Sequence, residues 1–402
     1  MDAGLPSAEA VAVRDGRIMF VGTSGQVSTL KGPSTRTIEL RGRTVVPGFV
    51  DGHLHPADLA AAGGSSMPLQ DRIARGVQFA LSYGVTGAHD MEATAETMEA
   101  YKALIAAGQF PFRVNAYPRV SGEGEPLDRI LAAGRYEDPG GRLQVRGVSV
   151  ALDGTLADRT AALAAPYTDD PSTAGAVRMP SDQLVSILEK SLKARFTVAI
   201  GAVGDRAAQV ALDAVEQALT RAPVKDHRIR IEHAQVLRPA DVPRFAELGV
   251  LASWQWIRCT LDMPWAEQRI GAERMATAYA WRTLLATGAR IVGGSDETGR
   301  NVSPFLGIHA AVTRQDARGR PSAGWYPAQR LTREEALRSY SLDPAYAAFQ
   351  EVRAGMLAPG RLADLAVLSR DITTASASDL LRTEALMTIV GGQVVFERGP
   401  GK

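Results

Sequence analysis

The chain of 402 residues is long enough for one large domain or two, and its 45% hydrophobic and 22% charged residues are ordinary for a globular protein. Its 45 basic and 44 acidic residues give a net charge of +1, so neither nucleic acid nor an acidic membrane is an expected partner. The single Cys259 excludes an internal disulfide, and without a membrane-length apolar run or a signal-peptide pattern we expect a cytoplasmic protein.

Both ends of the chain predict short β-strands. Residues 8–22 and 35–49 alternate apolar and polar positions, and Asp15-Gly16 is typical of a hairpin turn between two such runs. Residues 363–371 and 387–399 return to this pattern. We therefore expect one small flanking β-sandwich built from both termini, with an N-terminal part over 1–48 and a C-terminal part over 348–402.

The middle of the chain alternates short apolar runs with helical stretches such as "SDQLVSILEKSLKARF". Strands that alternate with helices indicate a parallel sheet, and eight such units over 49–347 predict an α/β fold, a (β/α)8 TIM barrel. An open doubly wound sheet is less favoured, because no glycine-rich phosphate turn follows the first strand. The predicted strands are 44–53, 84–90, 112–119, 145–153, 195–203, 228–234, 249–255 and 289–295.

Polar and titratable residues gather where these strands end, which is where such barrels carry their chemistry. In "GFVDGHLHP" the histidines His53 and His55 stand one residue apart, so strand alternation puts both on one face. Residues of the same kind end the later strands: Ser149, Asp153, His233, Arg258, Asp296 and Glu297. These positions are far apart in sequence, so their common character indicates one functional site.

Several longer stretches resemble the amidohydrolase superfamily, in the branch of N-substituted formamide deformylase and related metal-dependent hydrolases. They include "VVPGFVDGHLHP", "DGTLADRTAAL", "RIEHAQVLRPADVPRFAELGV", "GGSDE" and "GMLAPGRLADLAVLSRD". The resemblance implies a barrel with a flanking β-sandwich, in agreement with the pattern above. It also implies that His53, His55, His233 and Asp296 match metal-binding positions of that superfamily.

The sequence departs from the superfamily pattern at the strand ends. Ser149 stands where the resemblance implies a carboxylated lysine that bridges two metals, and Gly201 stands where it implies a histidine. Trp256, Arg258 and Glu297 also replace other residue types there. After the two histidines, the chain reads "ADLAAAGGSSMPLQD", a short segment of linker composition. Changes confined to the strand ends suggest a diverted or engineered active site.

The remaining ligands predict at most one divalent metal per chain, zinc or a similar ion, on His53, His55 and Asp296. The alternative is a site without metal, in which the two histidines are relics of a metal centre. With a metal, we expect an amidohydrolase-like hydrolase of amide or other C–N bonds. In that case Asp296 moves the proton and His233 binds the substrate carbonyl.

Without a metal, we expect Asp296 or Glu297 to act as a general base of raised pKa, for proton abstraction or elimination on a flat aromatic substrate. Arg258 would then stabilise the negative charge that develops. A third possibility is a non-catalytic small-molecule binder. For every case the expected partner is a small molecule, and the chain is a candidate homodimer.

The predicted substrate contacts belong above all to the metal-free hypothesis with its flat substrate. Trp254 and Trp256 would form an aromatic wall, although a packing role is the ordinary one for such residues. Ser149 and Asp153 would offer polar contacts from the neighbouring strand end.

Overall fold

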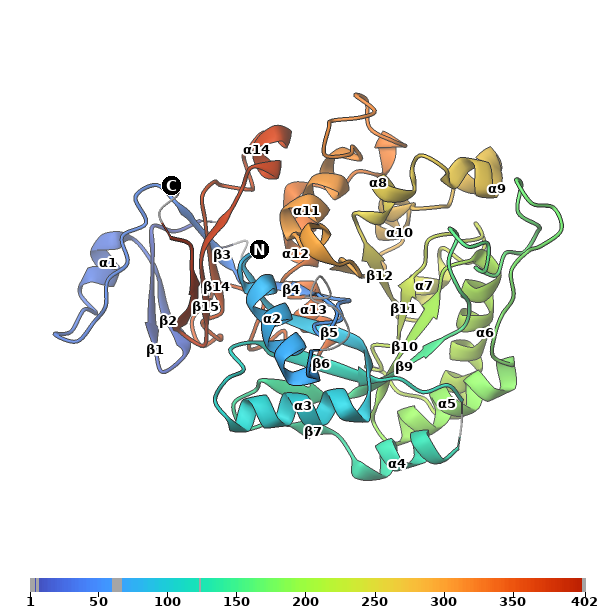
Figure 1. Ribbon diagram of the computed structural model, residues 1–402, viewed down its shortest axis with the longest axis horizontal. Helices are drawn as coiled ribbons and strands as arrows, with labels where there is room; N and C mark the ends of the chain where they lie inside the picture. The colour runs from blue at the N-terminus through green and yellow to red at the C-terminus, as the bar shows by residue number, and fades with distance from the viewer. Residues whose placement is uncertain (1–3, 5–6, 60–66, 123, 400–402) are drawn as a thin grey trace.

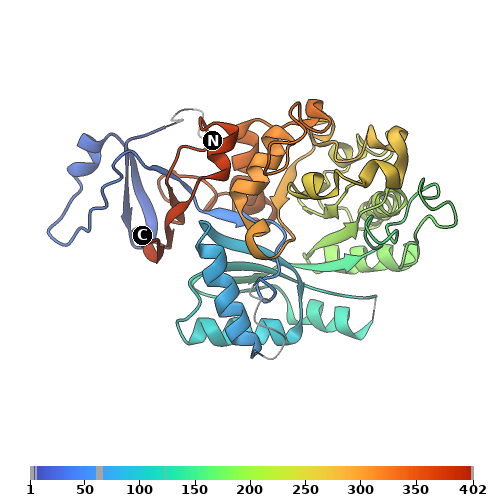
Figure 2. The same ribbon diagram turned by 45° about the horizontal axis from the view of Figure 1, so that its top comes forward.

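The computed structural model describes residues 4, 7–59, 67–122 and 124–399. Strands occupy the interior of the larger part of the molecule, helices surround them, and a smaller β-region from both ends of the chain lies to one side (Figure 1). A view turned by 45° shows the same arrangement (Figure 2). The segment of linker composition spans 57–71, and its middle part, 60–66, lies outside the described residues.

The interior strands form two five-stranded sheets, in the orders β4-β5-β6-β8-β7 and β13-β12-β11-β10-β9. Every pairing is parallel except that of β7 with β8. Each of the eight predicted segments overlaps one of these strands, and β7 and β8 have no predicted segment of their own. The bounds are β4 Phe49–Asp51, β5 Val85–Ala93, β6 Arg113–Pro118, β7 Tyr136–Glu137, β8 Leu143–Val145, β9 Gly147–Ala151, β10 Thr197–Ala202, β11 Arg230–His233, β12 Leu251–Gln255 and β13 Ile291–Gly294.

The two sheets meet along a first seam at Arg146. The strands β8 and β9 are one stretch of chain that this residue interrupts, and β8 pairs with β6 while β9 pairs with β10. Beyond β6, an isolated bridge links Arg119 to Ser149, and the Val120 N–H donates to the Ser149 carbonyl at 2.9 Å. Residues from both sheets therefore lie beside Ser149.

A second seam joins β4 to β13. The Gly52 N–H donates to the Gly293 carbonyl at 2.9 Å, and the Asp296 N–H donates to the His53 carbonyl at 2.9 Å. The buried carboxylate of Asp51 accepts from the backbone N–H of both His53 and Ser295 at 3.0 Å. These bonds hold the ends of β4 and β13 together, but the strands do not form one closed hydrogen-bonded barrel.

Helices connect most of the parallel strands and cover the outside of the sheets (Figure 1). Helix α6, for example, buries the alanines of one face together with Leu212 and Val215, as expected for a helix packed on a sheet. The helices of this region are α2 Leu69–Leu81, α3 Ala95–Ala106, α4 Glu125–Ala133, α5 Ser181–Lys193, α6 Asp205–Arg221, α7 Arg244–Glu247, α8 Arg258–Asp262, α9 Ala266–Met275, α10 Trp281–Ala286, α11 Pro304–Thr313, α12 Arg333–Ser339 and α13 Leu342–Ala347. Among the described residues, no helix is long and apolar enough to cross a membrane.

Both termini contribute to the β-region at the side. A four-stranded antiparallel sheet has the order β16-β15-β14-β3, and β1 pairs with β2 in a separate hairpin. Ile18 of the hairpin shares an apolar cluster with Leu365, Val367 and Ile389 of the larger sheet. Both ends of the chain therefore contribute strands to the same region, as expected. The β-sandwich and the domain limits stay predictions. The elements are β1 Ala10–Arg14, β2 Arg17–Gly22, α1 Ser24–Ser28, β3 Thr44–Pro47, β14 Leu365–Leu368, α14 Ala377–Leu381, β15 Ala385–Val390 and β16 Gln393–Glu397.

Two details of these strands follow from the residues. The predicted hairpin turn is confirmed, because Asp15 and Gly16 both adopt positive φ angles, 51° and 73°, as the tight turn between twisted strands requires. The prediction of one strand over 44–53 is wrong. The chain changes sheets at Gly48, so β3 belongs to the terminal sheet and β4 to the interior one.

Candidate active site

A cavity of about 200 Å³ opens at the carboxyl ends of the interior strands. Its walls combine ionisable side chains with small apolar ones, so it offers both chemistry and room for a small molecule. The residues that line it are His53, His55, Met91, Glu92, Arg119, Ser149, Val150, Ala151, Ala199, Gly201, Glu232, His233 and Asp296.

His53 follows β4, and a contact between its Nδ1 and Glu232 fixes the orientation of its ring. Its Nδ1 lies 2.7 Å from Oε2 of Glu232, and the side chain is nearly fully buried. A carboxylate can only accept a hydrogen bond, so Nδ1 carries the hydrogen and Nε2 keeps its lone pair in the neutral ring. That Nε2 lies 3.6 Å from Oδ1 of Asp296. A lone pair that faces a carboxylate favours a cation between them.

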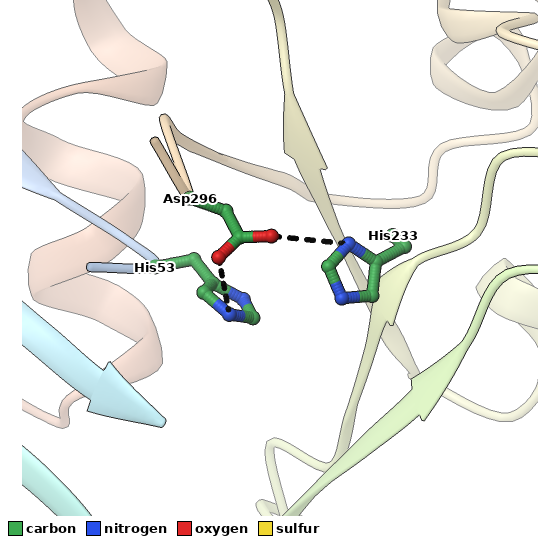
Figure 3. A group of neighbouring side chains, drawn as sticks. All are labelled: His53, His233 and Asp296. Atoms are coloured by element: carbon green, nitrogen blue, oxygen red, sulfur yellow. Dashed lines mark ion pairs between the residues drawn. The ribbon is translucent and has the colours of Figure 1, made fainter. Parts of the chain in front are cut away.

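His233 and Asp296 enter the cavity through an unusual backbone conformation. Their φ angles are 72° and 48°, in the left-handed region that residues other than glycine seldom adopt. Nδ1 of His233 lies 2.9 Å from Oε1 of Gln255 and 4.0 Å from Oδ2 of Asp296. Figure 3 shows the aspartate between the two rings of His53 and His233. Backbone strain at such positions is common where a side chain must be aimed at a site.

These three residues form a donor set that fits one metal ion. One donor atom from each of His53, His233 and Asp296 lies within 4.8 Å of the others. Ligands of a tetrahedral zinc stand about 3.3 Å apart, so a small contraction brings the set into range. Both imidazoles have their Nδ1 engaged by Glu232 and Gln255, an outer contact typical of metal-binding histidines.

His55, the other histidine predicted as a ligand, lines the same cavity. Its Nε2 is 3.4 Å from Oδ1 of Asp296, its Nδ1 is 3.5 Å from Oδ1 of Asp90, and it is not part of the three-residue group. Burial alone would lower the pKa of His55, but the two carboxylates raise it to about 10. In this geometry His55 is a cation between the carboxylates of Asp90 and Asp296. Among the candidate ligands, His233 stands where the sequence analysis expected His55.

The electrostatics of Asp296 differ from the expectation of a raised pKa. Burial raises the pKa of this carboxyl, but His53, His55 and His233 outweigh that effect and hold it well below its usual range. Burial lowers the pKa of His233, although Asp296 opposes the shift. Asp296 is therefore ionised and weakly basic in this environment.

Glu297 and Arg258 form an ion pair with each other. Arg258 Nη2 lies 2.9 Å from Oε1 of Glu297 and 4.0 Å from Oδ2 of Asp296. Arg258 opens the short helix α8, and its side chain is about one-third exposed. The structure thus brings both predicted residues beside Asp296, although neither lines the cavity.

Of the two predicted polar contacts, only Ser149 reaches the cavity. Its hydroxyl donates to the backbone carbonyls of Met91 and Tyr117 at the first seam, so its hydrogen is already used. Asp153 does not line the cavity. Its carboxylate accepts three backbone N–H groups at 2.9 Å, from Ala162, Val203 and Gly204. Asp153 therefore holds two loops together, which does not support contact with substrate.

The two tryptophans are also away from the cavity. Trp254 and Trp256 are 2% and 0% exposed and pack edge-to-face with each other and against Trp281. The Trp254 Nε1–H donates to the Ala234 carbonyl, and the Trp256 Nε1–H donates to the Ser339 hydroxyl, both at 3.0 Å. The predicted aromatic wall is thus a packed core cluster, because both rings and both N–H groups are fully engaged.

Sequence reasoning missed Arg230 and Glu232, two charged residues buried within the sheets. Alternation along β11 gives them the same face, a signal that the pattern "RIEH" contains. Burial would raise the pKa of Glu232, but the adjacent Arg230 and His53 lower it to about 2. Burial and the charge of Arg230 hold the pKa of His89 well below its usual range. The candidate ligands therefore rest on a charged interior layer.

Comparisons with known proteins identify the family of the chain. Residues 66–396 match the family described as "Amidohydrolase family". The chain is 31% identical over 322 residues to YtcJ of Bacillus subtilis (strain 168), whose name places it among the amidohydrolases. The matched region covers 78% of this chain and 59% of that protein. The chain is 27% identical over 336 residues to the N-substituted formamide deformylase of Arthrobacter pascens, covering 79% of this chain and 58% of that protein.

The chain thus spans under two-thirds of the length of these two relatives. A crystal structure of an uncharacterized metal-dependent hydrolase from Pyrococcus furiosus superposes with a TM-score of 0.78 at 23% identity, covering 90% of this chain and 95% of that one. At this identity the likeness concerns the fold alone, and it supports an α/β fold of the TIM-barrel type.

Proposed function

The chain belongs to the amidohydrolase family, and on that basis we propose that it is a metal-dependent hydrolase of an amide or other C–N bond in a small molecule. The observation that carries the proposal is the convergence of His53, His233 and Asp296 on one cavity. The deformylase among its relatives acts, by name, on an N-substituted formamide, which supports a C–N bond as the target. The cavity of about 200 Å³ suits a small substrate.

We propose at most one divalent ion, zinc in the first instance, on His53, His233 and Asp296. A divalent ion there would supply Lewis acidity to the reaction. A second ion has little support, because the Ser149 hydroxyl already donates to backbone carbonyls and Gly201 has no side chain. These are the two positions at which the sequence departs from the superfamily pattern.

Asp296 is the proposed proton carrier. Its ionised carboxylate lines the cavity, so it offers an acceptor for a proton of the attacking water, and the protonated acid can pass that proton to the leaving nitrogen. His233 lies beside His53, with ring centroids 5.1 Å apart, and its Nδ1 contacts Gln255, so its proposed role is that of a metal ligand rather than a binder of the substrate carbonyl. Protonated His55, 3.4 Å from Oδ1, helps to hold Asp296 in place.

The two alternatives from the sequence have less support. A metal-free general base needs a raised carboxylate pKa, whereas the pKa of Asp296 is lowered and Glu297 is paired with Arg258. A flat aromatic substrate needs an aromatic wall, whereas Trp254 and Trp256 are packed in the core. Ligand binding without turnover would distinguish a non-catalytic binder from an enzyme.

The test is metal content and turnover in one preparation. Plasma mass spectrometry after purification without chelator should find about one divalent metal per chain. Hydrolysis of a panel of N-formyl and N-acyl amines should stop with chelator and return with zinc. Turnover that persists in chelator would overturn the metal-dependent mechanism. Two metals per chain would overturn the single-ion site.

A further inference from the structure

We propose that the buried pair Arg230–Glu232 is a positioning pair that sets the tautomer of His53 and thereby its capacity to bind a metal. Neither residue is a proposed metal ligand. The consequence for metal binding rests on the proposed function, whereas the consequence for the tautomer does not.

Arg230 is held by contacts from β5, β11 and β12 and from the turn that follows β4. It is 0% exposed, its Nε donates to Oε1 of Glu232, and its Nη2 donates to the Gly52 carbonyl at 2.7 Å and to the Ser253 hydroxyl at 2.6 Å. Its Nη1 lies 2.8 Å from Nδ1 of His89. An arginine only donates, so His89 must accept at Nδ1 and carry its hydrogen on Nε2. The guanidinium therefore has one orientation.

The orientation of the guanidinium determines which hydrogen bonds each oxygen of Glu232 accepts. Oε1 receives the Arg230 Nε–H, while Oε2 accepts from Nδ1 of His53 at 2.7 Å and from Arg230 Nη2 at 3.2 Å. Because the carboxylate offers only acceptors to His53, the hydrogen of the neutral ring must stand on Nδ1. The lone pair then stands on Nε2, which is the atom that faces Asp296.

Stability is a weak explanation for this pair. Removing two charges from water costs about as much as their mutual attraction returns, and apolar replacements of buried ion pairs are often neutral or stabilising. The interior of such barrels is usually filled by branched apolar residues. Arg230 and Glu232 are 0% and 3% exposed, and Oε2 of Glu232 contacts the candidate ligand His53. The clearest consequence of the pair is therefore the orientation of that ligand.

The discriminating variant is Glu232→Gln, which keeps the shape of the side chain. Its single oxygen is drawn to Arg230, which needs an acceptor, so its NH₂ group faces Nδ1 of His53. Since an amide NH₂ can only donate, the ring must move its hydrogen to Nε2. The lone pair is then lost from the face toward Asp296. Arg230→Met tests the other half of the pair, because it leaves the carboxylate unpaired.

The first experiment reads the tautomer by NMR. Protein labelled with ¹⁵N-histidine has six histidines, and the signal of His53 is assigned by its loss in His53→Ala. The Nδ1–H tautomer is expected in the wild type, as purified and after addition of zinc, and the Nε2–H tautomer is expected in Glu232→Gln. An Nε2–H tautomer in the wild type overturns the proposal, even if no variant folds. An unchanged tautomer in folded Glu232→Gln also overturns it.

The second experiment measures zinc affinity by competition with a chromophoric chelator. Glu232→Gln and Arg230→Met should weaken binding by about 10- to 100-fold, the usual effect of losing an outer contact to a ligand. The matched control is Arg113→Met, which breaks another largely buried arginine–carboxylate pair, with Asp364, outside the cavity. It should lose stability and change the affinity less than about twofold.

Equal losses of affinity in the control and in the pair variants would make the role merely structural and overturn the proposal. A wild type that binds no zinc would instead contradict the proposed function. In that case the tautomer experiment still decides the role of the pair.

Discussion

Nε2 of His53 lies 3.6 Å from Oδ1 of Asp296, although one residue follows β4 and the other follows β13. The Asp296 N–H also donates to the His53 carbonyl at 2.9 Å, so the contact between the side chains is built on a contact between the backbones. The second seam between the two sheets is therefore also where the candidate metal site is assembled.

Asp296→Asn should abolish zinc binding and lower turnover by about 10²- to 10⁴-fold, because it removes a ligand and the proton carrier together. Glu297→Gln is the matched control. It loses the ion pair with Arg258 but should keep the metal. Metal content and turnover, measured on both variants, check the prediction. Retained metal in Asp296→Asn would show that the ligand set is wrong.

His233→Ala should lose stoichiometric zinc, whereas His55→Ala should retain it with a smaller loss of affinity. The reason is that His233 belongs to the three-residue group and His55 does not. Equilibrium dialysis with zinc gives the stoichiometry of each variant. The reverse order of effects would restore the ligand set expected from the sequence, in which His55 binds the ion.

Trp256→Phe should lower the free energy of unfolding by about 1–3 kcal/mol, because it removes a bond to the Ser339 hydroxyl and part of a fully buried ring. Zinc affinity should not change. Urea titration and chelator competition measure the two quantities. Trp265→Phe, at a half-buried position, should cost less. A Trp256 variant with full stability but a raised KM would instead support an aromatic wall.

Cys259 should resist thiol reagents in the folded protein. Burial raises the pKa of this thiol to about 12, so at pH 8 the fraction of reactive thiolate falls far below that of an ordinary cysteine. Ellman's reagent should react slowly with the native chain and rapidly in guanidinium chloride. Rapid reaction of the native protein would show that Cys259 is accessible. The chain has a single cysteine, so the signal is unambiguous.

The pair Arg282–Glu335 should make stability depend on acid pH. The hydrogen bonds from Arg282 lower the pKa of Glu335 from 4.5 to about 2. A lowered carboxyl pKa stabilises the fold above pH 4.5, and that contribution is lost as the pH falls toward 2. Glu335→Gln should thus be destabilised at pH 7, and the difference from wild type should shrink below pH 4.5. Urea titrations at several pH values measure it, and a difference independent of pH would contradict it.

The sequence by itself located most of the local elements and part of the candidate site. Alternation and turn residues located the eight strand segments and the hairpin at Asp15-Gly16, because strand faces and tight turns are set by neighbours in the chain. The strand-end rule also placed His53, His233 and Asp296 in the candidate set, because parallel strands bring their carboxyl ends together.

The tertiary structure decided what each of these residues does. Alternation puts His233 on the face opposite Glu232, yet both line the cavity, and His233 has a positive φ of 72° there, while His55 lies between Asp90 and Asp296. The strand-end rule could not tell that Trp254 and Trp256 pack into the core, or that Ser149 closes a seam. The pKa of Asp296 is lowered because two histidines that follow β4 and one at the end of β11 surround it, and such through-space charges depend on contacts that sequence separation does not reveal.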